Sequence, residues 1–230
     1  MFIMKHTGKK IISLVLAAIM LSALILCFTG CSKNDGPFVY VSVANEKGEI
    51  VALYEKVAYT ENMTVDNALA ALHAEKCKDG YASYESDFGL SMSKLWGVEN
   101  GGSYGYYVNN ASPSSLADTL KENDHVYAYI YTDTQTFSDT YAFFNVNTAE
   151  IGAGEKLSLT LSCLSYDASW NLATLSVSNA VIEIDGEASE YKTDADGKAE
   201  IIFDKKGTYV VTASRDTMTL VPAFVIVTVK

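Results

Sequence analysis

The residues around Cys31 have the types and spacing of a secreted chain that is cut before a reactive thiol. Three lysines precede an apolar run from Ile11 to Phe28, and Thr29-Gly30 then leads into the cysteine. A basic start, an apolar stretch and small residues before a cleavage point are typical of a secretory signal. We therefore expect a signal peptide over residues 1–30 and a mature chain that begins at Cys31.

Thr29-Gly30-Cys31 resembles a bacterial lipobox, although Phe28 stands where that pattern prefers Leu. The resemblance implies that Cys31 is lipidated and that residues 31–37 form a short tether to the membrane. The alternative is a transmembrane helix, because this run of 18 mostly apolar residues is nearly long enough to span a bilayer. The stop at small residues and a cysteine favours the lipid anchor. We expect an extracytoplasmic protein that is lipid-anchored to the bacterial cell membrane.

The charge of the chain argues against a nucleic-acid partner. The full chain has net charge −11, and the first 30 residues hold three of the 17 basic residues and none of the 28 acidic ones. The mature part therefore has 14 basic and 28 acidic residues, a net charge of −14. Such a surface repels nucleic acid and anionic lipid.

Motifs that carry enzymatic chemistry are missing from the sequence, which has no Gly-x-Ser-x-Gly, no His-Glu-x-x-His and no phosphate-binding loop. His73 falls within a predicted helix and His125 begins a predicted strand, so each is expected to be a structural or surface residue rather than a general base. Asp194-Ala195-Asp196-Gly197 resembles the start of a calcium loop, but the twelfth position holds Lys205 instead of a bidentate acid. We predict a turn there, no catalytic or metal-binding residues, and a protein that is not an enzyme.

Two cysteines besides Cys31 remain in the mature part, Cys77 in its first half and Cys163 in its second. They could form an interdomain disulfide, which secretion permits. Two separate thiols are the favoured reading, because two lone cysteines at no motif spacing are weak support for a bridge.

The first half of the mature chain predicts an α+β domain over residues 38–135. Phe38–Val43 and Ile50–Tyr59 alternate in the manner of paired strands and form a hairpin. Thr64 is a good N-cap, and apolar residues then recur at helical spacing through about Lys76. We expect residues 78–100 to be irregular, and further strands over 104–110 and 125–131, the last with one aromatic face.

The second half, residues 136–230, predicts an all-β domain. Short strands with turn signals about every ten residues are typical of a β-sandwich. The expected strands are 143–146, 157–164, 173–177, 180–184, 198–203, 207–214 and 223–229. No linker of low complexity separates the halves, so the two domains are expected to abut at residues 135–140.

Residues 64–131 resemble a family of bacterial surface domains of undefined function that is related to the C-terminal domain of the cobalamin carriers transcobalamin and intrinsic factor. The matching pieces are Thr64–Leu69, Trp96-Gly97, Gly105–Asn109 and Leu120–Val126. Two turn glycines of the family are Asn110 and Asn123 here, and asparagine also tolerates positive φ. The tryptophan common in the aromatic strand is replaced by Gly105 with flanking tyrosines. The resemblance implies a β-grasp fold.

Two segments of the second half, Thr193–Ala199 and Gly207–Ala213, resemble bacterial immunoglobulin-like domains of surface proteins. The resemblance implies an immunoglobulin-like β-sandwich that acts as a spacer or a support for binding.

The candidate ligand-binding residues are Trp96, Tyr104, Tyr106 and Asn109. Tryptophan and tyrosine offer a flat apolar body with one polar tip, and the nearby glycines let backbone approach a ligand closely. Strand alternation places Tyr104 and Tyr106 on one face and Tyr107 on the other. The alternative is that these aromatic side chains belong to the core.

These features predict a membrane-anchored lipoprotein that binds, without catalysis, a small molecule or a surface or transporter protein. One alternative is a corrinoid-binding (cobalamin-binding) lipoprotein that feeds a transporter, for which a corrinoid would be the only cofactor. The cobalamin carriers also use a large helical domain, which this sequence lacks. The other alternative is a structural or adhesive surface module.

Overall fold

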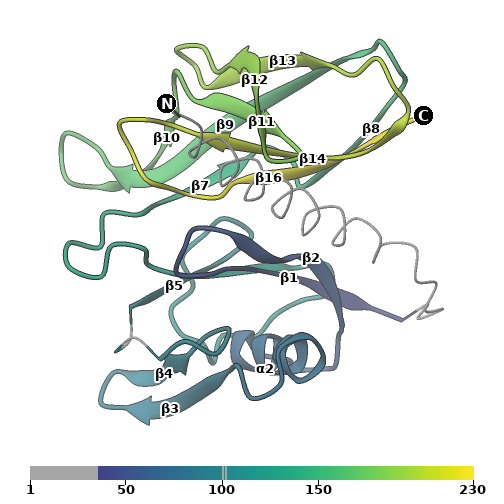
Figure 1. Cartoon of the computed structure of the whole chain (residues 1–230). Helices are drawn as coiled ribbons and strands as arrows, with labels where there is room; N and C mark the ends of the chain where they lie inside the picture. The colour runs from purple at the N-terminus through teal and green to yellow at the C-terminus, as the bar shows by residue number, and fades with distance from the viewer. Residues whose placement is uncertain (1–35, 100, 102) are drawn as a thin grey trace, which may run out of the picture.

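Helix α2 (Val65–Lys76), a four-stranded sheet and a β-sandwich form three successive layers in the computed structural model (Figure 1). The structure describes residues 36–99, 101 and 103–230. The expected signal peptide and Cys31 lie outside these residues. Within the described ranges, no helix is long and apolar enough to cross a membrane.

The four-stranded sheet contains the four strands that the sequence predicted in the first half. Its order is β2 (Ile50–Ala58), β1 (Phe38–Ala44), β6 (His125–Ile130) and β5 (Tyr104–Val108). The two central strands, β1 and β6, run parallel, and the two outer pairs are antiparallel. The edge strand β5 ends in a turn in which Asn109 and Asn110 both have positive φ.

Helix α2 begins where the sequence placed it. The Thr64 hydroxyl accepts a bond from the Asn67 N–H, and the Asn67 amide oxygen accepts one from the Thr64 N–H, both at 3.2 Å. This capping box satisfies two of the backbone donors that the first turn leaves unpaired. The apolar stripe of the helix, which includes Leu69 and Leu72, packs on one face of the sheet with Val41 of β1.

The prediction that residues 78–100 are irregular is wrong. This segment contains the hairpin of β3 (Ala82–Ser86) and β4 (Gly89–Lys94), paired antiparallel. Met92 is the only residue of the two strands that is fully buried. Because a hairpin with so little buried surface needs no apolar alternation, its sequence of serines and charged residues gave no strand signal.

The second half is a β-sandwich. One sheet runs in the order β10 (Leu172–Ser176), β9 (Lys156–Tyr166), β7 (Thr140–Phe144) and β15 (Leu220–Val221), and β13 (Lys198–Ile202) also pairs with β9. The other runs in the order β12 (Glu187–Lys192), β11 (Val181–Ile184), β14 (Gly207–Ser214), β16 (Phe224–Val229) and β8 (Thr148–Ile151). A shared apolar core that includes Leu159, Ile182 and Val225 lies between them.

The strand order of this sandwich is immunoglobulin-like. The first, second and fifth strands of such a domain lie in one sheet, where this chain has β7, β9 and β13. The third, sixth and seventh lie in the other, where it has β11, β14 and β16, with β12 added at the edge. The sequence did not predict β8, β12 or β15, which are short or mostly exposed, and it began β7 at Phe143 instead of Thr140.

The second face of the four-stranded sheet packs on the sandwich through a cluster that we call the aromatic interface. Its fully buried members are Ala44, Leu53, Tyr127, Tyr129, Tyr141, Val210, Val221, Phe224 and Ile226. The Tyr127 hydroxyl donates to the Pro222 carbonyl at 2.6 Å, and the Tyr141 hydroxyl donates to the Asn110 side-chain oxygen at 2.9 Å. The aromatic face expected on β6 is therefore buried between the two halves.

The structure also bears on the two cysteines and on the segment that resembles the start of a calcium loop. Cys77 and Cys163 are both free thiols, as favoured from the sequence. The Asp194 carboxylate accepts bonds from the N–H groups of Asp196 and Lys198, and Gly197 has φ +76°, so this segment is a turn. Among the described residues there is no group of three or more His, Cys, Asp or Glu side chains that could hold a metal ion.

Candidate functional site

Trp96 follows β4, in a tight turn that backbone bonds between Leu95 and Val98 close. It has φ +48°, an uncommon conformation for a bulky residue, and its backbone N–H donates to Nε2 of His73 at 3.3 Å. The two rings meet edge to face with centroids 5.2 Å apart. Trp96 is half-buried and packs against the core of the first half.

His73 fixes this arrangement from helix α2. Its Nδ1 lies 2.7 Å from the Leu69 carbonyl oxygen, so this nitrogen carries the proton and Nε2 is the acceptor for Trp96. Burial lowers the pKa of His73, and the bond to the Leu69 carbonyl offsets part of that shift. A neutral imidazole with both nitrogens bonded is a structural connector, as the sequence suggested.

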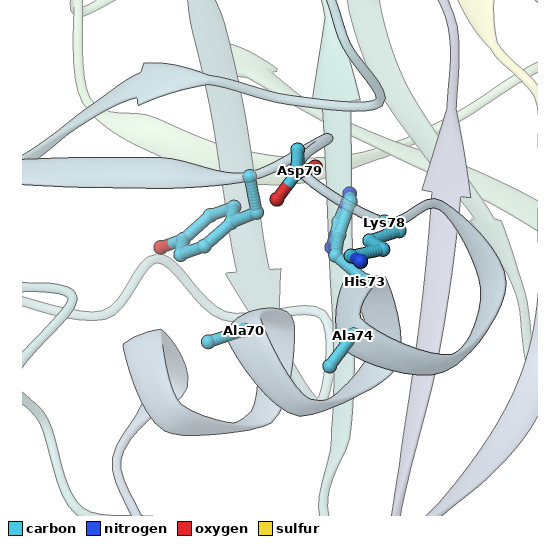
Figure 2. A pocket seen from close by; sticks show the side chains of 6 residues that line it. Ala70, His73, Ala74, Lys78 and Asp79 are labelled. Atoms are coloured by element: carbon cyan, nitrogen blue, oxygen red, sulfur yellow. The ribbon is translucent and has the colours of Figure 1, made fainter.

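A small surface pocket opens beside His73. It has a volume of about 330 Å³ and is lined by Ala70, His73, Ala74, Lys78, Asp79 and Tyr81. Figure 2 shows the two alanines and His73 on the helix, with Lys78 and Asp79 on the segment that follows it. Tyr81 packs on His73 with ring centroids 5.3 Å apart and donates to the Asp66 carboxylate at 2.8 Å. The pocket is therefore bordered by two aromatic rings that pack on each other, those of His73 and Tyr81.

Tyr104 and Tyr106 lie on the face of β5 that points to the helix, and Tyr107 lies on the opposite face in the aromatic interface. The sequence predicted this division. The Tyr104 hydroxyl lies 2.9 Å from the carbonyl oxygens of both Ser93 and Val98. It thus ties β5 to the segment that carries Trp96, so these two predicted site residues do come together.

Asn109 lies at the other end of β5 from Tyr104. Five residues of extended strand span about 17 Å, so the structure does not bring Asn109 to Trp96. Its amide nitrogen donates to the Asp124 carboxylate at 2.7 Å, and its oxygen accepts a bond from the His125 N–H at 2.9 Å. The side chain closes the base of the loop that connects β5 to β6, and its polar atoms are directed to that role.

His125 is held within the packed layers. Its Nε2 lies 2.9 Å from the Ser42 hydroxyl, and its ring meets Tyr54 and Phe224 edge to face. Burial lowers the pKa of His125 to about 3. It is therefore neutral and inaccessible, as expected for a structural residue.

Sequence reasoning missed a second set of aromatic residues, which the structure leaves on the surface. Trp170, Tyr166 and Phe137 are 82%, 61% and 52% exposed. The available signal was a tryptophan between Ser169 and Asn171 in a polar turn, where a buried aromatic residue is not expected.

Among known proteins, this chain is similar only to solved structures, and that similarity is weak. No protein-family model matches the chain, and no curated protein matches it. A Dscam structure that explains isoform specificity aligns with this chain at a TM-score of 0.27 and 14% identity. The alignment covers 49% of this chain and 26% of the Dscam chain. The four N-terminal Ig domains of Dscam1 isoform 4.4 align with this chain at a TM-score of 0.27 and 11% identity. The alignment covers 87% of this chain and 45% of the Dscam1 chain.

The tandem Ig repeats of Dlar have TM-score 0.24 and 13% identity, with 65% of this chain and 75% of that chain covered. This chain spans about a quarter of the length of the first Dscam structure and less than half of Dscam1 isoform 4.4. The immunoglobulin-like assignment of the second half follows from the strand order described above.

Proposed function

We propose that this chain is a membrane-anchored extracytoplasmic lipoprotein that acts as a non-catalytic interaction module. Cys31 would be its lipidation site, residues 38–135 a β-grasp domain and residues 136–230 an immunoglobulin-like domain. The sheet order β2-β1-β6-β5, with parallel central strands and one helix across a face, supports the β-grasp assignment.

The observation that carries this proposal is the placement of the exposed aromatic loops relative to the start of β1. The β3–β4 turn, the β6–β7 loop and the β9–β10 turn lie at the left end of the molecule, whereas β1 begins at the right end (Figure 1). Phe88, Phe137 and Trp170, which are 99%, 52% and 82% exposed, belong to these three loops. An exposed aromatic surface is typical of an interaction site.

The anchor would hold the opposite end of the molecule near the membrane. The six residues between Cys31 and Phe38 span at most about 20 Å when fully extended. A lipid on Cys31 would thus keep the start of β1 close to the bilayer and direct the aromatic loops away from it.

Lipidation and orientation can be tested separately in cells. Cys31→Ser should release the protein from membranes or leave a longer precursor, and globomycin should have the same effect. A photo-crosslinking amino acid at Ser169 of the β9–β10 turn should capture a surface partner, whereas one at Glu150 of β8 should not. Unchanged mass and membrane retention after Cys31→Ser would rule out the anchor, and equal capture at both positions would rule out the orientation.

The pocket beside His73 supports a second candidate, the binding of a small molecule near Trp96. Its volume of about 330 Å³ is at the lower end of the range for organic ligands, so it fits a ligand much smaller than a corrinoid. A thermal-shift screen against wild type and Ala74→Leu, which fills the pocket from the helix, tests this candidate. A ligand whose stabilisation survives Ala74→Leu binds elsewhere.

A further inference from the structure

Two groups of side chains, one on the segment from β6 to β7 and one at the β9–β10 turn, border the aromatic interface. We call them together the aromatic rim: the half-buried Tyr131 with Phe137, and Tyr166 with Trp170 and Leu172. The ring centroids of Tyr131 and Phe137 are 5.4 Å apart, and those of Tyr166 and Trp170 are 6.2 Å apart. Leu172 is the direct cross-strand neighbour of Tyr166.

Both groups of the rim border the aromatic interface. Tyr131 packs against that cluster, and so does Leu164, which shares a face of β9 with Tyr166. Within the interface, the Tyr107 ring stacks on Tyr141 with centroids 3.8 Å apart. The rim is therefore the exposed continuation of a buried contact between the two halves.

Two tight loops hold the rim residues in place. Trp170 has φ +61° and its N–H donates to the Asp167 carbonyl at 3.0 Å, while the Asp167 carboxylate accepts bonds from Ser169 and Asn171. Phe137 repeats this arrangement, with φ +53° and a bond from its N–H to the Asp133 carbonyl at 3.1 Å. A loop whose backbone is already ordered loses less conformational entropy when a partner arrives.

A carboxylate lies in each of the two loops that carry the exposed rings: Asp133 in the loop of Phe137 and Asp167 in the loop of Trp170. Residues 131–140 and 164–176 contain three acidic residues and no basic one. Bonds from the Thr136 hydroxyl and neighbouring N–H groups lower the pKa of Asp133, and backbone bonds from Asn171 and Ser169 lower that of Asp167, so both are ionised at neutral pH. Among the described residues, neither carboxylate forms an ion pair with a lysine, an arginine or a histidine.

We propose, building on the interaction function above, that the aromatic rim binds a protein segment that carries both basic and apolar side chains. Lysine or arginine would meet the carboxylates of Asp133 and Asp167 and the faces of Trp170 and Tyr166, where cations bind favourably. Apolar side chains of the partner would cover Phe137 and Leu172. A second copy of this chain and an anionic membrane both fit poorly, because each would bring negative charge to a negative surface.

The test uses the full chain in detergent and three labelled twelve-residue peptides. A Lys-Phe-Gly repeat carries both features, a Glu-Phe-Gly repeat reverses the charge, and a Lys-Ser-Gly repeat removes the aromatic rings. We expect binding of the first alone, with an affinity that falls as salt is added. Trp170→Ala should weaken that binding about tenfold or more, whereas Tyr84→Ala, which removes an exposed aromatic ring of β3 outside the rim, should not.

The charge requirement has its own matched pair of variants. Asp167→Asn keeps the oxygen that caps the β9–β10 turn but removes the charge, and it should weaken binding of the Lys-Phe-Gly peptide by about threefold. Asp194→Asn makes the same change in the β12–β13 turn and should have no effect. Circular dichroism shows whether each variant keeps the wild-type fold.

Four results would each overturn the proposal. They are no binding of the Lys-Phe-Gly peptide at about 1 mM, equal binding of the Glu-Phe-Gly peptide, binding instead to phosphatidylglycerol vesicles, and self-association that Trp170→Ala abolishes. Because these measurements use purified protein, their failure is distinct from that of the cellular crosslinking, which tests the interaction function itself.

Discussion

Tyr107 of β5 stacks on Tyr141 of β7 with ring centroids 3.8 Å apart, and this contact joins the four-stranded sheet to the sandwich. Tyr141 is 2% exposed and its hydroxyl bonds to the Asn110 side chain, which lies in the turn after β5. One residue of the second half thus contacts both the strand and the turn of the first. The two halves should therefore unfold together.

Tyr141→Ala should lower the free energy of unfolding by about 3–5 kcal/mol, because it removes a buried aromatic ring from the interface. The Trp96→Phe variant keeps only Trp170, a fluorescent reporter of the second half, and the Trp170→Phe variant keeps only Trp96, a reporter of the first half. Both reporters should follow one denaturant transition in chains with Tyr141 and two transitions after Tyr141→Ala. Tyr141→Phe, which removes the hydroxyl alone, should cost about 1 kcal/mol and keep one transition.

Trp96→Ala should lower the free energy of unfolding by about 2 kcal/mol, less than a fully buried ring, because Trp96 is half-buried against the core. The backbone bond to His73 does not depend on the side chain and should remain. Urea unfolding of wild type, Trp96→Ala and Trp96→Phe measures this cost. A loss below about 0.5 kcal/mol would show that the ring contributes little to the core and is available to a ligand.

The regular strands and the helix could be predicted because local signals and tertiary packing agreed. The four strands of the first sheet alternate, and Thr64 with Asn67 forms the capping box that opens α2. The β3–β4 hairpin could not be predicted, since its strands bury almost nothing and are held by backbone pairing. Strand β8 depends on its parallel partner β16, a contact between residues some 78 positions apart.

The candidate site was predicted only in part. Alternation along β5 correctly divided Tyr104 and Tyr106 from Tyr107, because that division is a local property of a strand. It could not show that Asn109 would close the base of the β5–β6 loop or that His73 would hold Trp96 from the helix. Nor could it show which aromatic residues stay exposed, since burial of Tyr129 and exposure of Tyr166 depend on how the two halves pack.

Gly105→Ala should destabilise the protein by about 1–3 kcal/mol. A methyl group at this position would overlap with the ring of its cross-strand partner Tyr129, which is 1% exposed and bonds to the Tyr131 hydroxyl at 3.1 Å. The ring has no room to shift within the aromatic interface. Gly36→Ala, where an added methyl meets nothing within 4 Å, is the control and should change stability by less than about 0.5 kcal/mol.

His125 should make the folded state sensitive to acid. Burial lowers its pKa from 6.5 to about 3, so between these two values the unfolded chain binds a proton that the folded chain excludes. Its stabilising contribution is fully present above pH 6.5 and is lost as the pH falls toward 3, by up to about 1.4 kcal/mol per pH unit. The groups that face it are the Ser42 hydroxyl and the rings of Tyr54, Tyr127 and Phe224, none of which stabilises an imidazolium as a carboxylate would.

His125→Gln keeps a nitrogen that can bond to Ser42, and its side chain does not titrate. The free energy of unfolding of this variant should therefore fall less steeply than that of the wild type as the pH drops from 6.5 to 3. Burial lowers the pKa of His73 as well, in the same direction, and its share is common to both proteins. The difference between the two curves of unfolding free energy against pH therefore isolates His125. Parallel curves over this range would mean that the buried imidazole accepts its proton without opening the contact between the sheet and the sandwich.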